Sequence, residues 1–515
     1  MHQKLIWHWP ILLLIILTFI LRIVKLEQLF YFTYDESIPA FVARRIILWQ
    51  HIPLIGGVTP FGFHLAPYFY WLYTPILYLG YFNPIAWGYA SAGISVLTTL
   101  MIFLVGKTFG NKKIAITACI LWTFSYLANL YDRHLWALYW GPLTSLVVLF
   151  SLYQIIKGSQ KFVYVLGAVI ALSIHADPSN LVFLLLAIVT WIIFRLPIKK
   201  STFIALGLIL FSFLPLVIFD IRHNFANTKP IIQFWAQGRN NPGLEIQKFM
   251  DNTLLFPKTF SRLFYAFGDH EVSKQYSYCR VFVEEKFNSI PWPVIIISAV
   301  LLLTFIIWNL KSRFKNEGWR LISLLILLYF LGIQTYGTIF RADIFEHYIT
   351  GAFAVFLLIF AKSISILPKK LWLIFLAIFV FFNIYKLSQA RNNLGLTQKR
   401  QAIEYTMSQV GDNPFSLDSL STCWKLSGYR YLFTVFGKEP VKSYVDPNFS
   451  YLYGTTPVAT KHPPIVVSFV AHDFVPETEE FYKRYAVLKS HEAKNALFGN
   501  IEVIILDNSK GWFDK

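Results

Sequence analysis

The chain has 515 residues, of which 56% are hydrophobic and 18% aromatic but only 14% charged, and its mean hydropathy is +0.51. These values exclude an ordinary soluble globular protein and indicate a polytopic membrane protein. The formal net charge of +18 does not indicate a nucleic-acid partner. Its basic residues lie between apolar runs, where the positive-inside rule predicts them, and no basic, aromatic-interleaved soluble module accompanies them.

The first apolar run covers about residues 5–24 and is long enough to cross a bilayer, which takes about 20 residues. Lys4 precedes the run, and no small-residue cleavage site follows it. The sequence therefore predicts a retained signal-anchor whose amino end is cytoplasmic. The segment that follows the run then lies outside the cytoplasm.

That segment begins with two adjacent acids, Asp35 and Glu36, followed by residues of helical character. Two carboxylates at a membrane surface can accept a proton, coordinate a metal or cap a helix. Acids in the first turn of a helix stabilise it by about 0.3–1 kcal/mol through its dipole and unpaired N–H groups. Residue type alone leaves capping and chemistry equally open.

Further apolar runs recur along the chain, and basic residues mark every second connection between them. The runs lie near residues 86–106, 113–128, 138–156, 162–175, 179–195, 202–219, 290–309, 320–338, 349–366 and 370–386. The connections expected in the cytoplasm contain Lys107, Lys112, Lys113, Lys157, Lys161, Arg195, Lys199, Lys200, Lys311, Arg320, Lys362, Lys369 and Lys370. With the first run included, this pattern predicts about eleven crossings and an outward carboxyl end.

All of these basic connections lie on the cytoplasmic side only if the tyrosine- and proline-rich segment 66–82 does not cross the membrane. Aromatic-rich segments with a polar edge favour the membrane interface, so we expect this one to lie in or dip into the outer leaflet. Residues 25–85 then form one large external loop.

We predict two domains: a transmembrane domain at 1–387 and an external soluble α/β domain at 388–515. The second contains short β-favouring runs at 465–470 and 501–506 with helical stretches between them. Within the first, residues 222–289 are predicted to form another external loop with one or two helices. The expected fold is an all-α membrane bundle with external juxtamembrane helices and a small soluble tail.

Ionisable residues outside the cytoplasmic turns gather at one membrane face, in the external loops and at span ends. They are Asp35, Glu36, Arg44, Arg45, His64, Asp132, Arg133, His134, His175, Asp177, Asp220, Arg222, His223, Arg341, Asp343, Glu346 and His347. Ion-coupled transporters usually place such groups near mid-bilayer, whereas the span interiors here contain almost none. The distribution favours a reaction at the outer surface of the membrane.

These features together resemble the C-type glycosyltransferase superfamily. An amino-terminal span is followed by the Asp35-Glu36 pair, a short helix, and an aromatic segment that begins at His64-Leu65-Ala66-Pro67. Asp132-Arg133-His134, at the end of a span, resembles the second polar motif of the superfamily. The resemblance covers roughly residues 1–390. It is strongest to the branch with the protein O-mannosyltransferases and the lipid A aminoarabinose transferases.

The resemblance implies an enzyme that transfers a hexosyl or pentosyl group from a polyprenyl-phosphate donor to an extracytoplasmic lipid, glycan or protein. Asp35 would be the general base, with inversion at the sugar carbon, and Glu36 a supporting or metal-binding acid. A positioned carboxylate can contribute about 10²–10⁴-fold to such a reaction.

The lipid phosphate that leaves needs cationic donors or a metal. Arg133 and Arg341 are the first candidates, although an arginine at a span end is also a common interface anchor. The further candidates for binding donor phosphate or substrate are Asp132, His134, His64, Arg44 and Arg222. Asp343, Glu346 and His347 could share one helical face and hold a divalent ion such as Mg or Mn, or they could form a solvated face.

Two other functions use the same external residues. A transporter or flippase of lipid-linked intermediates would need no chemistry, and a lipid-linked polymer ligase would keep the chemistry but change the substrates. For each function the expected location is the cell (plasma) membrane, with membrane lipid as a partner.

Overall fold

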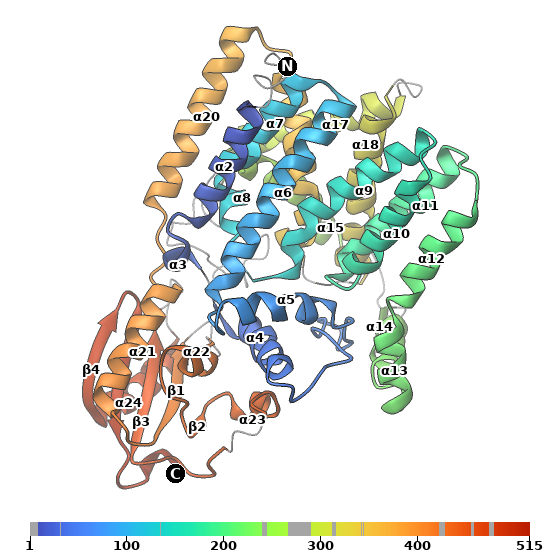
Figure 1. The fold of residues 1–515 in the computed structure, drawn as a ribbon. Coiled ribbons are helices and arrows are strands. Elements are labelled where there is room, and N and C mark those ends of the chain that lie inside the picture. The colour runs from blue at the N-terminus through green and yellow to red at the C-terminus, as the bar shows by residue number, and fades with distance from the viewer. Residues whose placement is uncertain are drawn as a thin grey trace.

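The computed structural model describes residues 9–30, 32–133, 135–238, 245–265, 290–311, 316–340, 342, 344–421, 428–454, 458–472 and 478–514. Every apolar run that we expect to cross the membrane contains a helix (Figure 1). These helices are α2 (Trp9–Ile23), α6 (Ile85–Phe109), α7 (Lys112–Phe124), α9 (Gly141–Ile156), α10 (Lys161–Ser173), α11 (Leu181–Ile193), α12 (Lys200–Phe211) with α13 (Leu214–Arg222), α17 (Trp292–Lys311), α18 (Glu317–Gln334), α19 (Phe353–Ile364) and α20 (Lys369–Gln389).

Among the described residues, six segments are long and apolar enough to cross a membrane by length and composition. They are 85–109, 200–222, 292–311, 317–339, 346–364 and 369–389. The apolar helices at 9–23, 141–156, 161–173 and 178–193 are shorter. The chain is thus a membrane protein, while the total of about eleven crossings stays a prediction.

The bundle is organised around α19. In its segment, 83% of the most apolar window is buried, against 22% for α20. Close packing at the centre uses small residues: a Cβ at Gly106 of α6 would lie 2.8 Å from the Cα of Ala115 in α7. On α20, by contrast, the side chains of Ile378 and Phe381 are 63% and 75% exposed. Apolar side chains turned outward in this way fit a lipid-facing helix.

Three short helices lie at one end of the bundle: α3 (Leu26–Leu29), α4 (Tyr34–Ile47) and α5 (Tyr68–Leu79). In Figure 1, α5 lies across the lower ends of the bundle helices, and α4 lies beneath it. The 12 residues of α5 run across the bundle helices and not parallel to them (Figure 1). This placement fits the prediction that segment 66–82 lies at the membrane surface.

The segment predicted as an external loop with one or two helices contains α14 (Thr228–Gly238) and α15 (Ile246–Phe264). The apolar face of α15 packs into the core of the bundle through Leu255, Phe256, Phe260 and Leu263. Much of this segment is therefore part of the scaffold. Its residues 239–244 and 266–289 lie outside the described part of the chain.

The tail folds around a five-stranded sheet in the order β2-β1-β3-β5-β4. Its elements are α21 (Leu396–Val410), β1 (Phe415–Ser421), α22 (Tyr429–Phe436), β2 (Lys442–Ser443), α23 (Asp446–Phe449), β3 (Ile465–Ala471), α24 (Glu479–Ser490), β4 (Glu492–Phe498) and β5 (Ile501–Asp507). Strand β1 is parallel to β2 and β3, whereas β5 is antiparallel to β3 and β4. Both runs predicted as strands are confirmed, and they pair with each other as β3 and β5.

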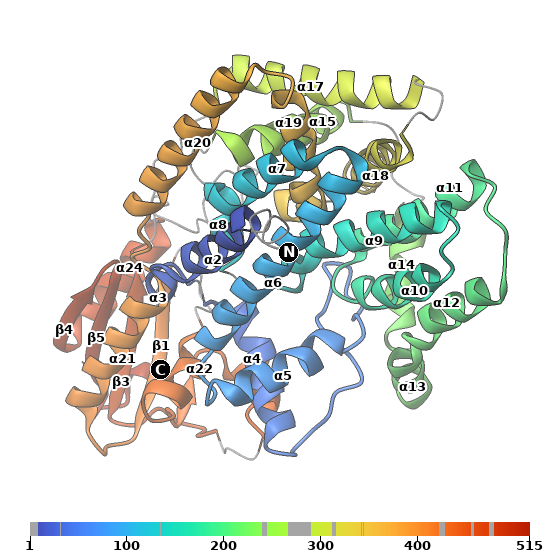
Figure 2. The same ribbon diagram turned by 45° about the horizontal axis from the view of Figure 1, so that its top comes forward.

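The tail lies at the same end of the bundle as α4 and α5, as both views show (Figure 1, Figure 2). One hydrophobic core joins them. It includes Leu26, Phe41 and Tyr73 from the first loop, and Leu396 and Tyr429 from the tail. The tail is thus packed against the loop that carries the acid pair. The boundary at 387/388 stays a prediction.

Candidate functional site

The acid pair lies in the first turn of α4, and its second member caps that helix. Thr33 is the N-cap residue, and its backbone N–H donates to Oε2 of Glu36 at 2.8 Å. The Thr33 side chain completes a capping box, an arrangement that satisfies two otherwise unpaired N–H groups. Glu36 is only 2% exposed. Of the three roles open to the pair, the structure shows helix capping for Glu36.

Asp35, the first acid, is partly exposed and lies near the hydroxyl of Tyr70 from α5. Burial raises the pKa of Tyr70, and the nearby Tyr451 and Asp35 raise it further. The Tyr70 hydroxyl therefore stays protonated at neutral pH. Asp35 of α4 and Tyr70 of α5 thus interact electrostatically at the end of the bundle.

His64 belongs to the connection between α4 and α5, which folds back on itself. Its Nδ1 lies 3.0 Å from the carbonyl oxygen of Gly56, and its backbone N–H donates to Oδ1 of Asn227 at 2.5 Å. Asn227 is itself held by Asp220, whose Oδ1 accepts from the Asn227 N–H at 2.7 Å. The imidazole of His64 thus packs within its own loop, which is tied to the end of α13.

The predicted second motif starts at Asp132, directly after α8 (Tyr126–Tyr131). Its first two residues, Asp132 and Arg133, are buried. Asp132 forms an ion pair with Arg22 of α2, with the Arg22 Nε 2.9 Å from the Asp132 Oδ2. Arg133 donates to the backbone carbonyls of Asn129, Leu21 and Val24. Both side chains therefore tie the end of α2 to the end of α8. His134 lies outside the described residues.

A second buried ion pair lies deeper in the bundle. Glu346 accepts through Oε2 from Arg262 of α15, and from the Tyr131 hydroxyl at 3.0 Å. Both charged side chains are almost fully buried, at 3% and 2% exposed. His347 lies among aromatic rings, with its ring centre 4.9 Å from that of Trp136.

These contacts bear on the predicted metal ligands. Within the described residues there is no group of three or more His, Cys, Asp or Glu side chains placed to hold a metal ion. Glu346 pairs with a cationic side chain, as described above, and Asp343 lies outside the described residues, as does Arg341 among the phosphate candidates. The metal stays a prediction.

Of the remaining predicted arginines, Arg44 points to the tail and Arg222 to the surface. Arg44 forms an ion pair with Glu439, with the Arg44 Nη2 3.0 Å from the Glu439 Oε1. Arg222 is exposed at the end of α13. The structure therefore brings together Asp35, Glu36 and Arg44 on α4, and Asp132 with Arg133 at the base of α2.

The tail contacts both ends of α4, the helix that carries Asp35 and Glu36, hereafter the acid helix. Near the start, the Leu396 N–H donates to the Phe30 carbonyl at 3.1 Å, and the buried Lys399 donates through Nζ to the Phe32 carbonyl. Near the end, Arg45 donates through Nη1 to the Tyr451 carbonyl at 2.8 Å. The position of Asp35 thus depends on where the tail docks.

A glycine allows the closest approach between the two parts. Gly428, at the start of α22, has φ +76°, and a Cβ there would lie 2.7 Å from the Thr33 carbonyl oxygen. Gly511, also in the tail, has a positive φ of +65°, but a Cβ there would meet no described atom within 4 Å. Replacing either with alanine incurs a backbone cost of about 1–2 kcal/mol. Only Gly428→Ala adds a clash against the N-cap of the acid helix.

We expect Gly428→Ala to destabilise the protein by about 1–3 kcal/mol more than Gly511→Ala, the usual cost of overpacking. Thermal unfolding of the purified full-length protein measures the difference. Limited proteolysis should also release the tail faster from the Gly428→Ala variant. Equal behaviour of the two variants would contradict the close docking.

Several residues of this region could not be named from the sequence. Arg22 carries a signal in retrospect, because a charge at the end of an apolar run is costly unless it has a partner. No sequence pattern singles out Arg262, Tyr70 or Lys399, because each is a common residue type for the segment in which it lies. Their partners come from distant parts of the chain.

Together, the fold and the site define a membrane protein with a helical bundle, an acid helix at one of its ends, and an α/β tail docked on that helix. No family model and no curated protein matches the sequence. Solved structures do match. The chain is similar to ArnT from Cupriavidus metallidurans bound to undecaprenyl phosphate, at 11% identity and a TM-score of 0.47, covering 97% of this chain and 98% of that one.

Two further similar structures are of the oligosaccharyltransferase from Archaeoglobus fulgidus. The complex with Zn and sulfate matches at 11% identity and a TM-score of 0.46, covering 89% of this chain and 67% of that one. The complex of the same organism's AglB with an inhibitory peptide and a dolichol-phosphate matches at 13% identity and a TM-score of 0.41, covering 90% and 69%.

Proposed function

We propose that the protein is an integral membrane glycosyltransferase that moves a sugar from a polyprenyl-phosphate donor to an extracytoplasmic acceptor. The observation that carries the proposal is the partly exposed Asp35 in the first turn of α4, where the neighbouring Glu36 is buried. Since Glu36 caps the helix, we assign the chemistry to Asp35. The resemblance of the Asp35-Glu36 pair to the acidic motif of the C-type glycosyltransferases supports the same assignment.

In the proposed reaction, the Asp35 carboxylate accepts the proton of the acceptor nucleophile as that nucleophile attacks the anomeric carbon. The bond from that carbon to the phosphate oxygen breaks, and the polyprenyl phosphate leaves with the electron pair. Attack opposite the leaving group inverts the anomeric centre. The Tyr70 hydroxyl, a donor at neutral pH, orients the carboxylate or the acceptor.

The phosphate needs positive charge close to the breaking bond. Arg341 and Arg133 remain the first candidates, with Arg44 and Arg222 behind them. For Arg133 to bind phosphate, it would have to give up its contacts with the carbonyls of Leu21 and Val24. No step of the proposed reaction uses a metal.

The proposed orientation places the amino end in the cytoplasm, and α4, α5 and the tail outside. A donor linked to a lipid follows from this orientation, because nucleotide sugars are cytoplasmic. The acid helix and the tail lie at the same end of the bundle (Figure 1), which supports a single external face.

The test is a transfer assay with the purified protein in lipid nanodiscs. Undecaprenyl- and dolichyl-phosphate hexoses and pentoses, each with a radiolabelled sugar, are compared with the corresponding nucleotide sugars, with a cell-envelope extract as acceptor. We expect label to pass from at least one lipid-linked donor to the extract, and none from nucleotide sugars. Direct use of a nucleotide sugar, or movement of the lipid-linked sugar across vesicles without transfer, would overturn the proposal.

A further inference from the structure

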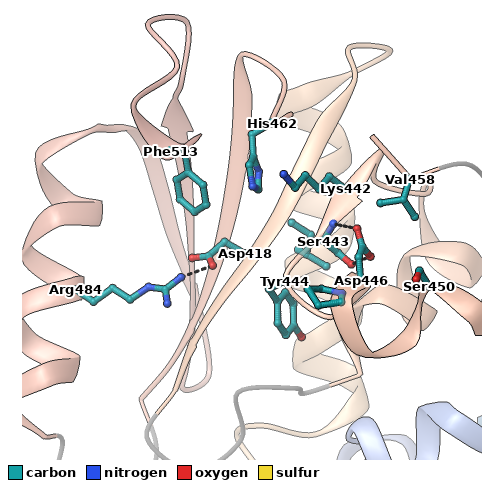
Figure 3. Close-up of a pocket in the computed structure, with 12 residues that line it drawn as sticks. Asp418, Lys442, Ser443, Tyr444, Asp446, Ser450, Val458, His462, Arg484 and Phe513 are labelled. Atoms are coloured by element: carbon teal, nitrogen blue, oxygen red, sulfur yellow. Dashed lines mark hydrogen bonds and ion pairs between the residues drawn. The ribbon is translucent and has the colours of Figure 1, made fainter. Parts of the chain in front are cut away.

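The tail contains a cavity of about 490 Å³ on the side of the sheet near β2. Figure 3 shows side chains that approach it from opposite walls. Its charged and polar lining includes Asp418, Lys442, Ser443, Asp446, His462 and Arg484. The volume falls in the range of about 300–1,000 Å³ that small-molecule sites usually have. None of these residues belongs to the acid helix or to the buried ion pairs of the bundle.

The floor of this cavity is unusually polar for the middle of a sheet. Strand β1 lies between β2 and β3, and its residues Ser416 and Asp418 share one face because side chains alternate along a strand. Asp418 is opposite Ser468 of β3. On the same face, Leu420 and Val470 lie on one side of this polar pair and Val466 lies on the other, and all three belong to an apolar cluster with α24. Asp418 and Ser468 are thus a polar pair between apolar neighbours, and Asp418 lines the cavity.

Burying the carboxylate of Asp418 is the main free-energy cost of this arrangement. Its side chain is 3% exposed, and taking an ionised carboxylate out of water costs several kcal/mol before it finds partners. It accepts from Arg484 Nη2 at 2.6 Å and from the Ser468 hydroxyl at 2.8 Å. An apolar residue, like its neighbours, would fill the position without that cost. The pair therefore points to a use beyond stability.

Arg484 lies at the opening: its side chain is 51% exposed, and in Figure 3 its guanidinium points to Asp418. On the opposite wall, Asp446 accepts from the Ser443 backbone N–H at 2.6 Å and from the Tyr453 hydroxyl at 3.0 Å. Each wall thus presents a fixed carboxylate. Lys442 adds a second cation to the lining.

An aromatic surface completes the cavity. The Phe513 ring lies against the imidazole of His462, with their centres 4.8 Å apart, and the His462 Nδ1 lies 2.8 Å from the Ser416 hydroxyl. Burial lowers the pKa of His462, and the nearby Lys442 lowers it further, whereas Asp514, Asp418 and Asp446 raise it by smaller amounts. The imidazole is therefore neutral at pH 7 and adds no third positive charge.

We propose that this cavity is a carbohydrate-binding site for one or two sugar units. Both carboxylates would repel an anionic ligand, and both cations would repel a cationic one. An apolar ligand would take water from Arg484 and Lys442, whose side chains are 51% and 23% exposed, and offer them no hydrogen bond in return. Sugar hydroxyls donate and accept at once, so they match carboxylates and cations together, and a sugar's C–H face fits against Phe513. The inference concerns binding by the tail and does not rest on the proposed function.

Saturation-transfer-difference NMR on the full-length protein in nanodiscs tests the site. The probes are the methyl glycosides of glucose, galactose, mannose, N-acetylglucosamine, xylose and glucuronic acid, together with the free sugars. We expect at least one of these sugars to bind with a Kd of about 1 mM, which corresponds to a binding free energy of about −4 kcal/mol. A preference for the methyl glycoside identifies a sugar linked within a glycan, whereas a preference for the free sugar identifies a soluble one.

Arg484→Gln and Lys442→Gln should each weaken this binding by about tenfold, a change of about 1.4 kcal/mol. Arg400→Gln is the matched control, because Arg400 is a half-exposed arginine of the tail that pairs with Glu27 and Glu404 outside the cavity. It should leave binding unchanged. Circular dichroism confirms that each variant is folded. The proposal is overturned if no probe binds, or if binding survives both cavity substitutions.

Discussion

Asp35→Asn should lower sugar transfer by at least about 10²-fold, the smaller end of the usual contribution of a positioned general base. Asparagine has nearly the same shape but cannot accept a proton at neutral pH, so the acceptor must attack with its proton in place. The variant should fold normally, because the capping box of α4 uses Thr33 and Glu36 and leaves Asp35 out. The measurement is the initial rate with a lipid-linked donor at saturating concentration.

Glu36→Gln is the matched control for this substitution. It makes the same change of carboxylate to amide at the neighbouring position, and glutamine serves in a capping box as glutamate does. We expect its rate to stay within a few-fold of that of the natural protein. A large loss in Glu36→Gln with little effect in Asp35→Asn would reverse the assignment of the two acids.

Binding of the donor separates catalysis from recognition. If Asp35 acts only on the proton of the acceptor, Asp35→Asn keeps its affinity for the lipid-linked sugar while the rate falls. An equal loss of affinity and rate would instead place Asp35 among the donor-binding groups.

The local features of this fold could be predicted from the sequence because they depend on neighbours along the chain. Apolar runs predicted the helices of the bundle, and β-branched runs predicted β3 and β5. Helix capping, the role that Glu36 has, was one of the three roles that two adjacent acids at the start of a helix allow. In each case, the residues that decide the structure lie within a few positions of one another.

The rest depends on contacts between distant segments. Asp132 and Arg133 could be recognised as polar residues at a span end, but their partners in α2 lie more than 100 residues away in the sequence. Arg262 reaches Glu346 only because α15 packs into the bundle. Nothing in the sequence of the tail indicates that it docks on α4. A pattern of residue types carries no information about which distant segment meets which.

Arg22→Met should destabilise the protein by about 3–5 kcal/mol, because it leaves the Asp132 carboxylate buried without its cation. Arg22 is fully buried, and Asp132 is almost so, at 0% and 7% side-chain exposure. Arg22 also donates to the backbone carbonyls of Thr123 and Trp122, at 2.6 and 3.0 Å, and those bonds are lost as well. Thermal unfolding in detergent, followed by size-exclusion chromatography, measures the effect.

The matched control is Arg400→Met, which breaks the ion pair between Arg400 and Glu27. These side chains are 44% and 40% exposed, and an exposed pair contributes only about 0–1 kcal/mol. The double variant Arg22→Met with Asp132→Leu should recover much of the stability lost in Arg22→Met, since it removes the unpaired charge along with its partner.

The double variant also decides what Asp132 does. If the ion pair only holds α2 to α8, the refolded double variant transfers sugar at nearly the natural rate. If Asp132 binds substrate, as its place in the second motif predicts, stability returns but transfer does not, and the apparent KM for the donor or acceptor rises. A structural role and a binding role thus predict opposite transfer rates for the double variant, because Asp132→Leu restores stability but also removes the carboxylate.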